Sequence, residues 1–127
     1  MKITGFNPSI LTSKPDELIP LFEDLGFEKS HSDHAAEGIV QGSARMKYAD
    51  FRLDITSTDR FPQDKTLIRM NVDDMEEAYH LLLDHGFCNA MGDGVMIEAE
   101  HFRGAHLVSP SGFEIMVMQH RRKERKI

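Results

Sequence analysis

The sequence has one cysteine and no long apolar run, and each shortage excludes a class of protein. Cys88 has no second cysteine to pair with, so the chain cannot form an internal disulfide or a cysteine-based metal cluster. The longest clean apolar run, Leu81-Leu82-Leu83, is far too short to cross a bilayer. The N-terminal stretch MKITGFNPSIL lacks the continuous apolar core of a secretory signal. We therefore expect a cytoplasmic protein with no membrane partner.

An excess of positive charge is also missing. The formal net charge is −6, so the phosphates of a nucleic acid would be repelled and we expect no nucleic-acid partner. Only the tail 121–127 is basic, and we interpret it as a solvated chain end in preference to a docking segment. A chain of 127 residues with 40% hydrophobic and 28% charged residues is typical of one globular domain with a real core.

The chain repeats itself at an interval of 60 residues. The pairs Gly26-Phe27 and Gly86-Phe87 are 60 positions apart, and so are Ser13 and Asp73. Ser13 and Asp73 each stand three positions before an acidic residue, which is the spacing of a helix capping box. The two glycines stand where the end of a helix needs a positive φ. These signals predict two equivalent helices.

Strand signals surround each helix in the same order. We predict strands at 3–11 and 67–72 before the helices, strands at 27–33, 44–49 and 51–57 after the first, and a hairpin around Gly92-Asp93-Gly94 with strands at 105–109 and 113–119 after the second. Pro20 falls inside the first helical window and predicts a kink or an irregular start there. The pattern indicates an α+β fold in a single domain of two βαβββ units, one at about 1–58 and one at about 66–120, followed by the basic tail.

Two segments resemble a known family. The stretch Ser109-Pro110-Ser111-Gly112, followed by the strand Phe113–Val117, is similar to the turn into the last strand of the vicinal-oxygen-chelate superfamily, which includes glyoxalases, bleomycin-resistance proteins and extradiol dioxygenases. The passage from Asn71 to Phe87 resembles the second strand-to-helix segment of that family. Together with the repeat, the resemblance extends over nearly the whole chain. It implies a cupped mixed β-sheet with helices on the outer face, a ligand site in the concavity, and a homodimer.

The same resemblance bears on metal binding. Metal-dependent members of the superfamily hold a divalent cation through four strands, usually with His, Gln or Glu side chains. Carried over position by position, the four places hold Asn7, Asp54, Leu67 and Met116. Leucine cannot coordinate a metal and a thioether prefers soft ions, so we expect no metal and no other cofactor. Metal-dependent glyoxalase or dioxygenase activity is accordingly not expected.

Strand alternation selects the residues that share the concave face, because successive side chains point to opposite sides of a sheet. The candidate ligand-binding residues are Asn7, Ser9, Arg52, Asp54, Leu67, Arg69, His101, His106, Glu114, Met116 and Met118. The two histidines border the cup mouth by resemblance and have the chemistry of general acids or bases, but no catalytic residue is assigned. An alternative interpretation is that the charged residues only pair across an exposed sheet and the methionines only fill the core.

The sequence thus predicts a glyoxalase/bleomycin-resistance-like protein that binds a small organic molecule in a metal-free concave pocket. One alternative is a lyase, isomerase or dioxygenase of the same superfamily. A second alternative is an interaction module that has kept the fold without a ligand.

Overall fold

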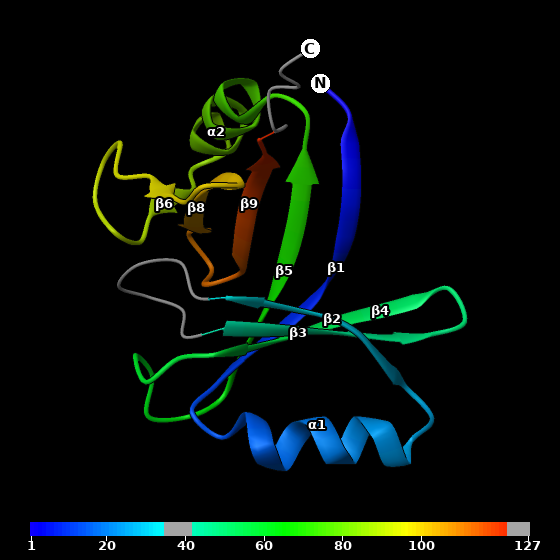
Figure 1. Cartoon of the computed structure of the whole chain (residues 1–127). Helices are drawn as coiled ribbons and strands as arrows, with labels where there is room; N and C mark the ends of the chain where they lie inside the picture. The colour runs from blue at the N-terminus through cyan, green and yellow to red at the C-terminus, as the bar shows by residue number, and fades with distance from the viewer. Residues whose placement is uncertain (35–41, 122–127) are drawn as a thin grey trace. The chain divides into compact units, whose positions relative to one another are not determined.

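The computed structural model describes residues 1–34 and 42–121, in which the chain forms two helices and nine strands (Figure 1). In chain order the elements are β1 (Ile3–Thr12), α1 (Pro15–Asp24), β2 (Glu28–His34), β3 (Gly42–Tyr48), β4 (Phe51–Ser57), β5 (Lys65–Val72), α2 (Met75–Asp84), β6 (Cys88–Asn89), β7 (Ile97–Glu98), β8 (Phe102–Val108) and β9 (Glu114–His120). The predicted basic tail, beyond Arg121, lies outside the described residues. Neither helix has the length and apolar character needed to span a membrane.

The chain divides into two compact units, each of which has its own helix and its own core. The first, here called the N-unit, comprises Asn7–Leu67, and the second, the C-unit, comprises Met1–Phe6 and Ile68–Ile127. The strand β1 begins in the C-unit and ends in the N-unit. The cupped shape predicted from the family depends on both units together and stays a prediction.

In the N-unit the strand order is β2-β3-β4-β1. β1 and β4 run parallel with Ser9 opposite Asp54, whereas β3 and β4 form an antiparallel hairpin with Arg45 opposite Asp54. One face of this sheet packs on α1. Its core comprises Ile10, Leu18, Ile19, Phe22, Phe27, Ala44, Met46, Leu53 and Ile55.

In the C-unit the strand order is β1-β5-β9-β8-β6, and β7 also pairs with β8. β5 and β9 run parallel with Arg69 opposite Met116, and β8 and β9 are antiparallel with His106 opposite Met116. One face packs on α2 through a core of Met70, Val72, Met75, Ala78, Tyr79, Ala105, Leu107, Ile115 and Val117. Both units thus contain parallel and antiparallel pairs, which confirms the predicted α+β fold with a mixed sheet.

The two predicted helix ends, 60 residues apart, are confirmed. Gly26 has φ 106° and Gly86 has φ 87°. Glycine adopts such positive φ angles with little steric strain. The next residue donates back to the helix in both copies, from Phe27 N to Phe22 O at 2.9 Å and from Phe87 N to Leu82 O at 3.0 Å. These bonds are those of a Schellman motif, which satisfies carbonyls that the end of a helix leaves without partners.

The predicted helix caps are wrong by one residue. The N-cap of α2 is Asp74, whose Oδ1 accepts from Glu77 N at 3.1 Å, and the N-cap of α1 is Lys14, which makes no side-chain capping bond. Asp73 is not the cap because it continues the pairing with the start of β1: its N donates to Lys2 O, and its Oδ1 accepts from Lys2 N. The helix α1 continues through Pro20 to Asp24.

The hairpin predicted around Gly92–Gly94 is also wrong. β6 and β7 do not pair with each other; both pair with β8, Cys88 opposite Val108 and Ile97 opposite Gly104. Side chains hold the intervening loop instead. The Tyr79 hydroxyl accepts from Asn89 Nδ2 at 3.2 Å and from Gly94 N at 3.1 Å.

Candidate functional site

The sheet face opposite the helix carries polar residues in each unit. In β4, Leu53 and Ile55 belong to the core, and the alternating residues Asp54 and Thr56 point to the other face, where both are also buried. Ser9 lies beside Asp54 on the same face and is buried too. Burial on both faces of one strand distinguishes this sheet from a surface sheet with one solvated side.

Asp54 organises the polar face of the N-unit. Its side chain is 4% exposed, and a carboxylate so deeply buried needs donors or a positive partner. Asn7 Nδ2 donates to Oδ2 at 2.7 Å, and Arg45 Nε lies 3.6 Å from Oδ1. The structure thus brings two predicted residues, Asn7 and Asp54, into direct contact.

Arg45 is a member of this group that the sequence analysis missed. A signal for it exists: Ala44 and Met46 are the apolar residues of β3, so Arg45 alternates to the polar face. The two-residue turn after Tyr48 sets the hairpin register that places Arg45 opposite Asp54. The predicted residue Arg52 shares this face but is exposed and lies opposite Lys47, away from the buried carboxylate.

In the C-unit the polar face is built around a histidine and a glutamate. His106 Nε2 lies 2.6 Å from Glu114 Oε1, and the two side chains are only 5% and 13% exposed. Met116 stands opposite His106, and Met118 opposite Gly104, so both predicted methionines share this face. The distance and burial indicate a strong hydrogen bond between the two side chains.

The remaining predicted residues differ in how far they are exposed to solvent. Arg69 is buried on the C-unit's polar face, opposite Met116, and its Nε donates to Asn71 Oδ1 at 3.3 Å. Leu67 is buried as well. His101 is exposed, and its Nε2 lies 3.7 Å from the carboxylate of its neighbour Glu100. The two candidate histidines are therefore in different environments, one on the surface and one buried.

The strand registers show how the positions compared with the family's metal ligands are paired within each unit. Ser9 opposite Asp54 in the N-unit corresponds to Arg69 opposite Met116 in the C-unit, so Met116 occupies the place of Asp54. Asn7 and Leu67 precede Ser9 and Arg69 by two residues each. A divalent cation needs several oxygen or imidazole donors. In the N-unit these positions supply one amide, one carboxylate and a leucine, and in the C-unit a thioether, which does not suit a hard cation.

The charges around these positions also disfavour a cation. Arg45 stands beside the carboxylate in the N-unit, and the buried Arg69 lies opposite Met116 in the C-unit. Among residues 1–34 and 42–121, no three His, Cys, Asp or Glu side chains form a group that could hold a metal ion. The residues present do not fit the metal of the family.

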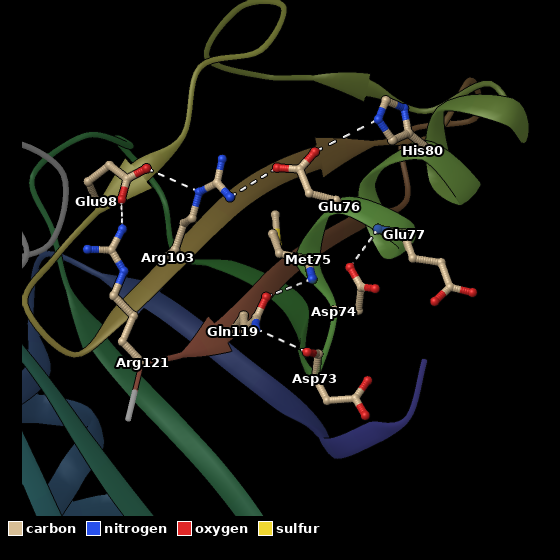
Figure 2. Close-up of polar contacts among 10 residues, drawn as sticks. All are labelled: Asp73, Asp74, Met75, Glu76, Glu77, His80, Glu98, Arg103, Gln119 and Arg121. Atoms are coloured by element: carbon tan, nitrogen blue, oxygen red, sulfur yellow. Dashed lines mark hydrogen bonds and ion pairs between the residues drawn. The ribbon is translucent and has the colours of Figure 1, made fainter. Parts of the chain in front are cut away.

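A second polar cluster lies on the C-unit surface, near the start of α2 (Figure 2). A shallow hollow of about 410 Å³ is lined there by Glu98, Arg103, Gln119 and Arg121. Arg103 bridges two carboxylates, with Nε 3.2 Å from Glu98 and Nη1 3.0 Å from Glu76, and Arg121 also contacts Glu98. Because each arginine is neutralised by a partner and the side chains are well solvated, this cluster serves to join β7, β8 and α2.

The matches between this chain and known proteins come from solved structures. No protein-family profile matches the sequence, and no curated protein matches it significantly. Solved structures do match. The structure of methylmalonyl-CoA epimerase from Mycobacterium tuberculosis is 14% identical with a TM-score of 0.69, and the match covers 94% of this chain and 90% of that one.

Two further structures agree. A glyoxalase/bleomycin resistance protein/dioxygenase superfamily member from Vibrio splendidus 12B01 is 13% identical with a TM-score of 0.62, over 93% of this chain and 99% of that one. A hypothetical protein from Bacillus halodurans C-125 is 12% identical with a TM-score of 0.70, over 94% and 96% of the two chains. Similarity at such low sequence identity shows the fold alone. The chain has the fold of the vicinal-oxygen-chelate superfamily, that of glyoxalases, bleomycin-resistance proteins and related dioxygenases.

Proposed function

We propose that this protein binds a small organic molecule on the polar sheet faces opposite its helices, and that it does so without a metal. The observation that carries the proposal is the content of the four family ligand positions, namely Asn7, Asp54, Leu67 and Met116. These four residues are unsuited to binding a metal ion that would act as a Lewis acid. The residues around them nevertheless combine polar and apolar side chains, as small-molecule binding sites do.

That mixture consists of a few buried polar anchors among apolar and polarisable side chains. Asp54 and His106 are buried and hydrogen-bonded, which gives them fixed orientations. Met116 and Met118 adjoin His106 and offer an adaptable surface for an apolar ligand body. Small-molecule sites typically combine apolar walls with a few precisely held polar groups.

One observation favours a second candidate function, an enzyme that uses its own acid–base groups. His106 is held 2.6 Å from a carboxylate, and a carboxylate partner orients an imidazole and sets its tautomer. Such an enzyme would turn over its ligand, whereas the binder would release it unchanged. The interaction module is the third outcome and predicts no small-molecule response.

A thermal-shift screen of the chelator-treated protein against a broad library of small organic molecules tests the proposal. A ligand present at 100 times its dissociation constant stabilises the native state by about 2.7 kcal/mol, which raises the melting temperature by several degrees. We expect hits whose mass is unchanged after incubation. Ligand turnover would favour the enzyme, and silence across the library would refute the binder.

Metal content is tested separately by elemental analysis of protein purified without chelator. We expect far less than one equivalent of zinc, nickel, iron or manganese. A full equivalent that is lost in Asp54→Ala would contradict the proposal, because it would show that the strand positions assigned here do hold a metal. The homodimer and the cytoplasmic location stay predictions, and light scattering and cell fractionation test them.

A further inference from the structure

Arg45 is held so that one edge of its guanidinium group is occupied and the other is available. Its Nε lies 3.6 Å from the carboxylate of Asp54, and its side chain is 31% exposed. An arginine has five N–H donors in a planar fork, and the Nε edge accounts for only part of them. Within the described residues, Nη1 and Nη2 have no protein partner.

The backbone opposite Arg45 contains a β-bulge. The pairing of β2 with β3 shifts register between Lys29 and His31, directly across from Met46 and Arg45. A bulge of this kind inserts an extra residue, here Ser30, whose hydroxyl donates to the Arg45 carbonyl at 3.3 Å. Bulges recur next to binding sites, where they redirect a side chain.

Basic side chains outnumber acidic ones on this face of the N-unit. Lys47 and Arg52 lie directly opposite each other in the hairpin, an arrangement of like charges that costs stability. Glu28 lies opposite Lys47 on β2, and Asp54 lies opposite Arg45. Among the side chains that the structure describes at these registers, three cations thus share two carboxylates, although the whole chain has a net charge of −6.

From these observations we propose that the N-unit holds a carboxylate group of the ligand, with Arg45 as its anchor. The inference rests on the proposed function and names its ligand class, small organic carboxylates. The outer fork of Arg45 matches a carboxylate in a bidentate geometry, and the ion pair with the buried Asp54 keeps the side chain on this face. Arg52 stands diagonally across the hairpin, a separation of roughly 7–8 Å, and supplies a second positive charge within reach of the bound group.

NMR titration with benzoate tests the anchor, and benzamide, of the same shape but uncharged, is the matched probe. The expected result is a saturable shift of the Arg45 Nε–Hε signal with benzoate and none with benzamide. Phenylacetate and pyruvate, each compared with its amide, extend the panel to other carboxylate shapes. Circular dichroism and the backbone amide spectrum verify that each variant is folded.

Four variants separate the role of Arg45 from general electrostatics. Arg45→Gln is expected to weaken carboxylate binding roughly ten- to a hundredfold, as the loss of a charge-assisted contact predicts. Arg45→Lys keeps the positive charge but lacks the planar fork of donors, so its carboxylate affinity should lie between those of the wild type and Arg45→Gln. Arg52→Gln should weaken binding by a smaller factor. Lys29→Gln removes the same charge from the opposite sheet face, where Lys29 pairs with Met46, and should change the affinity less than twofold.

The outcomes distinguish this inference from the proposed function. Equal carboxylate binding by Arg45→Gln and the wild type would overturn the anchor, and equal binding of the amides would overturn the ligand class. If all carboxylates are silent while neutral molecules in the wider screen raise the melting temperature, the inference fails and the proposed function stands. Silence of the whole screen would refute both.

Discussion

Gln119 connects the last strand to the start of α2, and its removal is the perturbation whose magnitude follows most directly from the structure. Its Oε1 accepts from Met75 N at 2.8 Å, and its Nε2 donates to Asp73 O at 3.0 Å (Figure 2). Met75 is the first residue of α2, so its N–H is one of those that a helix leaves without an internal partner. Gln119 therefore caps the helix from a distance of 44 residues along the chain.

We expect Gln119→Ala to lower the free energy of unfolding by about 1–2 kcal/mol. Two net hydrogen bonds of about 1 kcal/mol each give the upper value, and water replacing one partner at this half-buried site gives the lower. The range agrees with the loss of an ordinary N-cap, about 0.5–2 kcal/mol. In a domain of this size the melting temperature should fall by about 4–8 °C.

Urea denaturation measures the change, and hydrogen exchange at the Met75 amide locates it. Gln63→Ala is the matched control because Gln63 is exposed in the segment between β4 and β5, and it should change stability by less than about 0.5 kcal/mol. If Gln119→Ala is no more destabilising than this control, or if exchange of the Met75 amide is not accelerated, the capping argument is refuted.

Three further substitutions follow from the C-unit. Tyr79→Phe should cost about 1–2 kcal/mol in urea denaturation, because the hydroxyl accepts from the buried Asn89; an unchanged midpoint would contradict this. Gly104→Ala should cost at least about 1 kcal/mol, since an added Cβ would lie 2.9 Å from Val117 O, and a neutral effect would show that the strands can separate there. Arg103→Gln should cost less than about 1 kcal/mol, and less still in 1 M salt; an effect independent of salt would argue against an ionic role.

Much of the candidate site followed from strand alternation. Asp54 and Met116 were placed on the polar face by counting residues, and the structure puts each of them on the face opposite its unit's helix core. Strand alternation did not predict which residues of the polar face contact one another. Arg45 joins Asp54 because of the hairpin register, whereas Arg52 and His101 are exposed and separate from the buried groups.

The sequence by itself determined the repeat, the element types and the two glycine helix ends, because these depend on local backbone preferences and on periodicity within a few residues. Tertiary structure alone decided which partners the polar groups found. Asn7 and Asp54 meet from 47 residues apart, and Gln119, not Asp73, holds the first N–H of α2. The physical reason is that a hydrogen bond requires positions accurate to a few tenths of an ångström, which packing of whole strands and helices fixes and local sequence does not.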